Sequence, residues 1–299
     1  MSRGEGKTRA GRVAIVGRPN VGKSTLLNAL LGEPIAITSP HPQTTRDAVR
    51  GVLTVGDTQL VFVDTPGLHE ARSRLGHRMN ASARDEAREA DVLVLVVEPK
   101  VDPADLALAA ELPKLPTVLV INKIDKIKDK RDLLPMLARF GKAHPFAAIV
   151  PCSARRTRGM DGLLEELGPL VPEQPFLFEP DTLSDQPTRF FVAEFVREQI
   201  LSHTRQEVPH GVAVVVERFD ESSKVPRIEI AIHVSRETHK GIVVGAQGRM
   251  LKSIGTAARA RVEQMLGRQV HLKLWVRATP DWMNDPAKLR DMGYGEREP

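Results

Sequence analysis

The sequence predicts an α/β domain with a doubly wound parallel sheet, followed by a smaller α+β domain. Three observations support this fold class. A glycine-rich loop stands between an apolar run and a helical pattern near the N-terminus. Further apolar runs of buried parallel-strand type follow, and polar residues end them. Beyond a proline-rich stretch, apolar residues alternate with polar ones around a second glycine loop, as in half-exposed strands.

The first glycine-rich loop, Gly-Arg-Pro-Asn-Val-Gly-Lys-Ser, spans residues 17–24. Its spacing of Gly, four residues and Gly-Lys-Ser is typical of phosphate-binding loops. The apolar run 13–16 precedes it as a strand would, and residues 25–31 follow with helical spacing. In such loops, glycines let consecutive backbone N–H groups approach phosphate oxygens, and the helix N-terminus adds further donors. The loop therefore predicts a nucleoside triphosphate site.

Single residues of this loop have separate predicted roles. We expect Lys23 to reach the β- and γ-phosphates and the Ser24 hydroxyl to ligate Mg²⁺. The predicted nucleotide contacts also include the neighbouring residues Asn20, Val21, Gly22 and Thr25.

Two later segments complete the phosphate end of the site. Asp64 ends a strand-like run and precedes Thr-Pro-Gly, which predicts a carboxylate near Mg²⁺ and a γ-phosphate sensor at Gly67. In the preceding loop, Thr44 and Thr45 are both candidate Mg²⁺ ligands, and we choose Thr45 from its place beside Arg46. The predicted catalytic residues are Lys23, Thr45 and Gly67.

The motif Asn-Lys-Ile-Asp at residues 122–125 selects the base. The carboxylate of Asp125 can accept hydrogen bonds from the ring N–H and exocyclic amine of guanine. Adenine has neither donor in that place and would leave the acid unpaired. We expect Asn122 at the opposite edge of the base and the Lys123 stem along its face. The sequence therefore predicts a guanine nucleotide.

A short Ser153-Ala154 motif follows the last apolar run of the first domain, and the Ala154 N–H is expected to meet guanine O6. Together the motifs resemble those of the translation-factor-related GTPases, in the same order over residues 13–170. The resemblance rests on residues 17–24, 64–67, 122–125 and Ser153-Ala154. It implies binding of GTP and GDP with Mg²⁺, and hydrolysis of GTP.

The resemblance also bears on mechanism. Leu68 stands where Ras-like enzymes carry the glutamine that orients the attacking water, so we expect slow intrinsic hydrolysis. Asn20 matches an asparagine with which related GTPases hold K⁺ against the phosphates. This match implies K⁺-stimulated hydrolysis.

The second glycine loop, Gly245-Ala246-Gln247-Gly248, stands between two helical patterns. Gly-x-x-Gly in an α/β unit is typical of KH domains, which clamp single-stranded nucleic acid by its backbone. Residues 224–277 contain eleven Lys and Arg against three Glu, a net charge of +8, whereas the whole chain carries +5. Such a local excess suits a polyanion. The predicted RNA-binding residues are Gly245, Ala246, Gln247, Gly248, Arg249, Lys252 and Lys240.

A GTPase domain joined to a C-terminal type II KH module resembles the Era family. Segments 192–200, 239–245 and 280–286 share this resemblance. It implies GTP-dependent binding to the 3′ end of 16S rRNA and the 30S precursor, release after hydrolysis, and loose association with the inner membrane. The family usually has Lys-Gly in the middle of the clamp loop, where this chain has Ala-Gln. We therefore expect weaker or more salt-sensitive RNA binding, with Arg249 or Lys252 taking over a phosphate contact.

The expected domain organisation follows composition. We expect a basic N-terminal tail at 1–12, the GTPase domain at 13–170, a proline-rich linker at 171–187, and the KH domain with a C-terminal extension at 188–299.

The expected location is cytoplasmic, with peripheral inner-membrane association implied by resemblance. The polar, basic N-terminus lacks the apolar segment of a secretion signal, and the single Cys152 rules out an internal disulfide. We expect a monomer. Two alternative interpretations are a membrane-associated regulatory switch that uses the basic face on anionic lipid, and an RNA chaperone with a structural nucleotide site. A tRNA-modification GTPase fits less well, because such proteins lack a C-terminal KH module.

Overall fold

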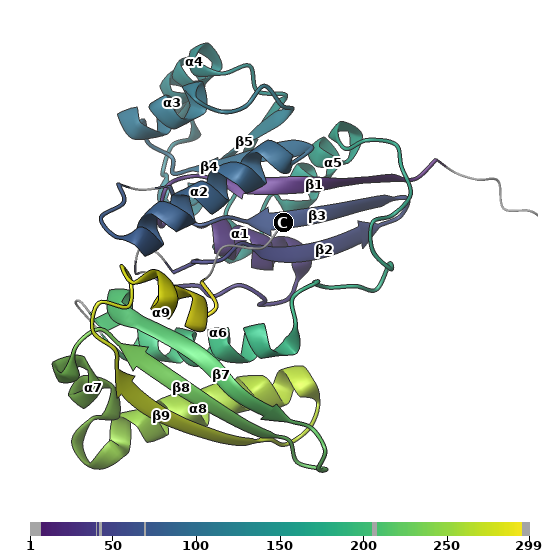
Figure 1. Cartoon of the computed structure of the whole chain (residues 1–299). Helices are drawn as coiled ribbons and strands as arrows, with labels where there is room; N and C mark the ends of the chain where they lie inside the picture. The colour runs from purple at the N-terminus through teal and green to yellow at the C-terminus, as the bar shows by residue number, and fades with distance from the viewer. Residues whose placement is uncertain (1–6, 40, 42–43, 69, 205–207, 295–299) are drawn as a thin grey trace, which may run out of the picture. The chain divides into compact units, whose positions relative to one another are not determined.

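The computed structural model describes residues 7–39, 41, 44–68, 70–204 and 208–294 (Figure 1). The start of the expected basic tail and the end of the C-terminal extension lie outside these residues. The chain divides into two compact units. The first comprises Met1–Ala36, Pro42–Glu70 and Met79–Asp185, and the second comprises Ile37–His41, Ala71–Arg78 and Gln186–Pro299.

A six-stranded sheet with the order β2-β3-β1-β4-β5-β6 forms the centre of the first unit. Its strands are β1 (Arg9–Val16), β2 (Val49–Val55), β3 (Thr58–Asp64), β4 (Val92–Val97), β5 (Thr117–Ile121) and β6 (Ala148–Pro151). All neighbours are parallel except β2 and β3, which pair antiparallel. The predicted parallel sheet is confirmed, and β2 is an additional strand that was not predicted. This edge strand joins β3 through a two-residue turn at Gly56, whose φ of 57° suits glycine.

Helices cover both faces of this sheet (Figure 1). They are α1 (Lys23–Leu31), α2 (Arg74–Glu89), α3 (Pro103–Ala110), α4 (Leu134–Ala143) and α5 (Met160–Leu167). Residues of α2, α3 and α4 share a core with one face of β1, β4 and β5, including the fully buried Leu93, Leu119 and Phe140. Short 3₁₀ turns cover Ile124–Lys126, Lys130–Leu133, Ala154–Arg156 and Gly168–Leu170. The polar motifs lie at the carboxyl ends of β1, β3, β5 and β6, so they lie at the same edge of the sheet.

The proline-rich stretch packs on the first unit through Gln59, which is fully buried in β3. Its Oε1 accepts the N–H groups of Leu177 and Phe178 at 2.8 and 2.9 Å, and its Nε2 donates to the Phe178 carbonyl at 2.9 Å. Farther along, the Val52 N–H donates to the Leu183 carbonyl. This part of the chain is therefore held along β2 and β3.

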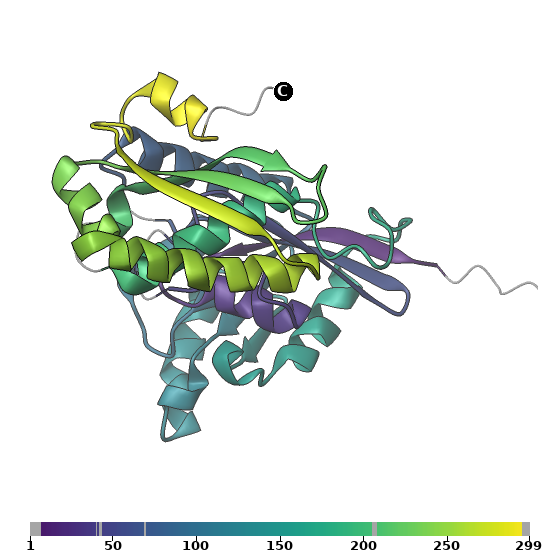
Figure 2. The ribbon, with the colours of Figure 1, turned by 90° about the horizontal axis from the view of Figure 1, so that it is seen from below.

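The second unit contains a three-stranded sheet, β7-β8-β9, in which β7 and β8 are antiparallel and β8 and β9 parallel. The elements are α6 (Thr188–His203), β7 (Val212–Asp220), β8 (Arg227–Val234), α7 (Glu237–Val244), α8 (Arg249–Leu266), β9 (His271–Ala278) and α9 (Pro286–Asp291), with 3₁₀ turns at Val208–Gly211 and Ala246–Gly248. The helices α6 and α8 contribute Val196, Ile200, Ile254 and Val262 to a core against the sheet. Figure 2 shows α8 running along the sheet.

Both tryptophans of the chain lie in the second unit. Trp282 is fully buried, donates its Nε1–H to the Gly211 carbonyl at 3.1 Å, and stacks on Tyr294 with ring centroids 5.9 Å apart. Trp275, on β9, lies between the cationic groups of Lys273 and Arg277, 5.6 and 5.5 Å from its ring centroid. The Trp282–Tyr294 stack anchors the C-terminal segment to the unit.

Candidate functional site

The phosphate loop lies between β1 and α1 and is built around a buried lysine. The Lys23 Nζ donates to the carbonyls of Gly17 and Arg18 at 3.1 and 3.0 Å. Gly22 has a φ of 102°, and a Cβ there would collide with the Asn122 amide, so only glycine fits. Burial lowers the pKa of Lys23 to about 8, and the nearby Asp64 carboxylate partly opposes this. An anion at the loop would restore the full positive charge.

Three oxygen-bearing side chains meet beside Lys23. The Asp64 Oδ2 accepts from the hydroxyls of Ser24 and Thr45 at 2.6 and 3.1 Å, and these hydroxyls lie 2.9 Å apart. The other carboxylate oxygen of Asp64 is buried and has no hydrogen-bond partner. Burial raises the pKa of this carboxyl, while Lys23 and the two hydroxyls lower it. The set fits Mg²⁺, which prefers oxygen ligands and whose charge would compensate the cost of burying the Asp64 carboxylate.

Of the three candidate metal ligands, Asp64 alone is a carboxylate. Among the residues that the structure describes, no three His, Cys, Asp or Glu side chains are grouped as a protein-only metal cage would require. This agrees with the way Mg²⁺ binds beside nucleotides, where phosphates and water supply the remaining ligands.

The segment after β3 packs tightly on the phosphate loop. The Thr65 hydroxyl donates to the Ile15 carbonyl at 2.8 Å, which fixes the start of the turn. A Cβ on Gly67 would lie 2.8 Å from the backbone nitrogen of Pro19, so glycine is required for this close approach. Leu68 follows and is partly exposed. The backbone at Gly67 therefore lies against the phosphate loop.

At the base end, the Ser153 hydroxyl donates to Asp125 at 2.5 Å. This bond is the main cause that lowers the pKa of the Asp125 carboxyl, which therefore stays ionised and able to accept from guanine.

Asn122 makes two hydrogen bonds within the site. Its Nδ2 donates to the Val21 carbonyl at 2.9 Å, and its Oδ1 accepts the N–H of Ala154 at 3.0 Å. The same Ala154 N–H is the group that is predicted to meet guanine O6. Because Asn122 is 2% exposed, the polar atoms of its side chain must find partners inside the protein. Asn122 thus ties the phosphate loop to the Ser-Ala turn.

Glu98, which follows β4, is not among the residues predicted from the sequence. Its carboxylate pairs with the Nζ of Lys123, which also donates to the Asn20 carbonyl. Lys123 has a φ of 63°, a strained conformation for a lysine. These contacts fix the side chain that is expected to lie along the base. A carboxylate directly after a buried strand could have indicated this role.

A second ion pair that was not predicted holds the phosphate loop to the start of α3. Arg18 pairs with Asp102, the N-cap of α3, and lies 3.9 Å from the buried Asp105. The Asp102 side chain also accepts the Ala104 N–H, so the helix start is capped. Burial raises the pKa of Asp105 to about 6.

The clamp loop in the second unit has an unusual backbone. Gly245 and Gly248 have φ values of 70° and 74°, and Gln247 between them has a φ of 54°. The N–H of Gly248 closes the turn onto the Gly245 carbonyl at 3.2 Å. A Cβ on Gly245 would lie 2.6 Å from the Cβ of Met250. Successive residues of this kind form concave arrangements of N–H groups that suit anions.

Three cations surround the clamp loop. Arg249 donates to the Ala246 carbonyl at 3.3 Å, and Lys240 pairs with Glu237 at 3.2 Å. Lys252 is exposed one turn into α8 and makes no ion pair with any described residue. The structure thus brings the predicted RNA-binding residues to one end of α7 and α8.

Comparisons with known proteins agree with this geometry. A family described as "50S ribosome-binding GTPase" matches residues 12–123, and one described as "KH domain" matches residues 207–283. The GTPase Era of Syntrophus aciditrophicus is 43% identical over 96% of both chains, and that of Ruminiclostridium cellulolyticum is 42% identical over 96% of this chain and 97% of its own. The chain belongs to the Era family of GTPases.

Two solved structures of Era resemble this chain over nearly its whole length. A variant of Aquifex aeolicus Era bound to GDP and AlF₄⁻ is 40% identical with a TM-score of 0.92, covering 96% of this chain and all of that one. Era in complex with MgGDPNP and nucleotides 1506–1542 of 16S ribosomal RNA is 39% identical with the same TM-score, covering 96% and 99%. A P-loop GTPase domain followed by a KH domain is therefore the fold of this Era-family chain.

No helix among residues 7–39, 44–68, 70–204 and 208–294 has the length and apolarity to cross a membrane.

Proposed function

We propose that this Era-family GTPase is an assembly factor of the small ribosomal subunit. In its GTP form it binds the 3′ end of 16S rRNA and the 30S precursor, and it is released after hydrolysis. The observation that carries the proposal is the TM-score of 0.92 to Era in complex with MgGDPNP and the 16S rRNA fragment. The clamp loop of this chain, with its positive φ values at Gly245, Gln247 and Gly248, supports the RNA part.

In the proposed mechanism, Ser24, Thr45 and Asp64 hold Mg²⁺, which neutralises charge on the β- and γ-phosphates. Lys23, desolvated and aimed at the loop carbonyls, supplies a positive charge in a site that excludes water. The backbone at Gly67, held against Pro19, senses the γ-phosphate. Release of this contact after hydrolysis would free the following segment.

The proposal includes slow intrinsic hydrolysis with K⁺ stimulation. Leu68 cannot orient a water molecule, so this role must come from elsewhere. Asn20, at a φ of 64° in the phosphate loop, is the proposed K⁺ ligand. Replacing K⁺ by Na⁺ should slow hydrolysis in the native protein and have less effect in an Asn20→Ala variant. Equal rates in the two salts would refute the K⁺ role.

Anisotropy of a labelled RNA from the 16S 3′ end tests the function directly. The protein is loaded with a non-hydrolysable GTP analogue or with GDP, and a scrambled RNA serves as control. We expect tighter, sequence-dependent binding in the GTP form. Binding that ignores both nucleotide and sequence would contradict the proposal, and preferential binding to anionic vesicles would favour a regulatory membrane switch instead.

A further inference from the structure

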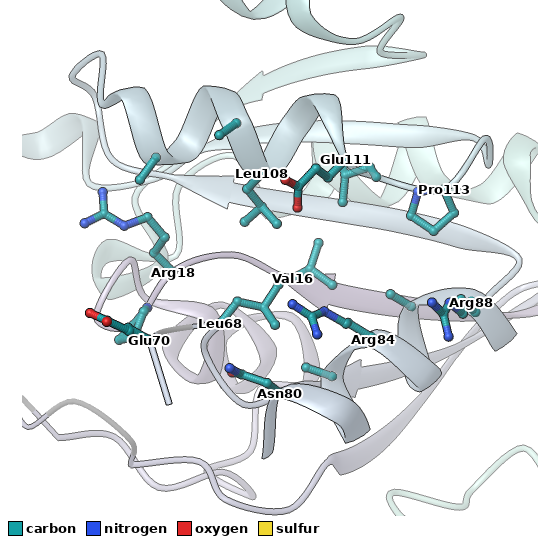
Figure 3. Close-up of a pocket in the computed structure, with 16 residues that line it drawn as sticks. Val16, Arg18, Leu68, Glu70, Asn80, Arg84, Arg88, Leu108, Glu111 and Pro113 are labelled. Atoms are coloured by element: carbon teal, nitrogen blue, oxygen red, sulfur yellow. The ribbon is translucent and has the colours of Figure 1, made fainter. Parts of the chain in front are cut away.

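A groove of about 890 Å³ lies in the first unit between α2 and α3, beside the phosphate loop (Figure 3). Both helices present alanines to it: Ala83 and Ala87 from α2, and Ala104 and Ala107 from α3. Because these side chains are small, the helices meet poorly here and an open channel remains. The channel is large enough for about two turns of a helix, at the packing density of protein interiors.

The floor of the groove connects it to the nucleotide site. Val16 ends β1 directly before the phosphate loop, and Leu68 directly follows Gly67. Figure 3 shows both side chains between the two helices, with Arg18 and Glu70 at one end. A ligand in the groove would therefore touch the residue that follows the γ-phosphate sensor.

The two walls carry opposite charge. Arg84 and Arg88 stand one turn apart on α2, and Glu111 stands on the α3 side (Figure 3). Among the described residues, Arg84 makes no ion pair, and Arg88 makes only an exposed one with Asp85 at 3.6 Å. Such an exposed pair contributes little. The cations of the α2 wall are thus available to a carboxylate-bearing partner.

The lining distinguishes between classes of partner. Its exposed lining is about equally polar and apolar, and Arg18, the third arginine, is already paired with Asp102. A nucleic acid backbone would meet the carboxylates of Glu70 and Glu111 and would gain few cations. An amphipathic helix instead carries apolar side chains on one face and charged ones beside them, which suits a groove with apolar residues such as Leu68 and Leu108 between charged walls.

We propose that this groove is the docking site for an amphipathic helix of a protein component of the 30S precursor. Its carboxylates would face Arg84 and Arg88, and a cation would face Glu111. The inference rests on the proposed function, because it assigns the groove a partner from the same particle.

Photo-crosslinking tests the inference with purified 30S precursor particles and full-length protein loaded with a GTP analogue. A photoreactive phenylalanine derivative replaces Ala107, which lines the groove, or Ala110, an exposed alanine of the same helix that does not. We expect position 107 to crosslink to a protein, in a product that ribonuclease leaves intact, and position 110 to give little product. The variant Arg84→Glu should reduce the yield at position 107 on the order of tenfold, as expected for loss of one interface hot spot.

A crosslink from position 107 to RNA, equal yields at the two positions, or an unchanged yield with Arg84→Glu would overturn the inference. Cosedimentation of the native protein with the particle is measured in parallel. If the protein cosediments but position 107 does not react preferentially, the groove inference alone fails. If the protein does not bind the particle, the proposed function fails and the inference falls with it.

Discussion

At the scale of single residues, burial of the Lys23 ammonium in the phosphate loop lowers its pKa and so links stability to pH. The unfolded chain keeps Lys23 protonated up to its ordinary pKa of 10.5, whereas the folded, nucleotide-free protein releases that proton near pH 8. The free energy of unfolding should therefore rise as pH increases from about 8 to 10.5, by at most ~3 kcal/mol. Urea denaturation at several pH values would show the rise in the native protein and its absence in Lys23→Met. A rise that survives in Lys23→Met would assign it to another group.

Glu98 gives a second prediction at this scale. The variant Glu98→Gln removes the charge that holds the Lys123 ammonium, so affinity for GTP and GDP should fall roughly threefold to tenfold. A fluorescent GDP analogue measures the change, and Glu98→Asp should restore part of the affinity. The matched control is Glu89→Gln, which changes an exposed carboxylate that pairs with Arg12 at 3.5 Å. Equal losses in the variant and the control would contradict the positioning role.

At the scale of elements, the clamp loop places a non-glycine residue, Gln247, at a positive φ. Gln247 adopts a φ of 54°, where a side chain costs on the order of 1 kcal/mol relative to glycine. The variant Gln247→Gly should therefore stabilise the second unit slightly, as seen in its thermal melting temperature. An unchanged or lower melting temperature would show that the Gln247 side chain makes compensating contacts.

Ala246→Lys is the companion prediction for the clamp loop. An added cation beside the backbone nest should tighten RNA binding and steepen the dependence of log affinity on log salt by about one ion. Ala257→Lys on α8, away from the loop in sequence, controls for charge alone. Similar gains in both variants would mean that total charge, and not the clamp loop, determines the affinity.

The sequence predicted most of the elements that carry a site, because a motif at a strand end reveals both the strand and its chemistry. The Ser24–Thr45–Asp64 cluster and the clamp loop are examples, because the sequence motifs that contain them also indicate where the neighbouring strands and helices end. The edge strand β2 was missed, since it follows a loop whose turn residues obscured its pattern. Glu98 and the Arg18–Asp102 pair were missed for another reason: their partners are distant in sequence and meet only in the folded sheet.

At the scale of the whole molecule, charge is distributed unevenly along the chain. Residues 224–277 carry a net charge of +8 against +5 for the entire chain, so the remainder is net acidic. RNA affinity should therefore fall steeply with salt, whereas GDP affinity, which depends on a buried loop, should change little. Titrations of both ligands across a salt series would check this contrast, and parallel slopes would contradict it.

The placement of the two tryptophans has a practical consequence. Trp275 and Trp282 are the only tryptophans of the chain, and both lie in the second unit, while the nucleotide residues Lys23, Asp64 and Asp125 lie in the first. Intrinsic tryptophan emission therefore comes from the second unit alone, from the fully buried Trp282 and the half-buried Trp275. A change in that emission when GTP replaces GDP would therefore show, without any label, that exchange of the nucleotide in the first unit alters the environment of the tryptophans in the second.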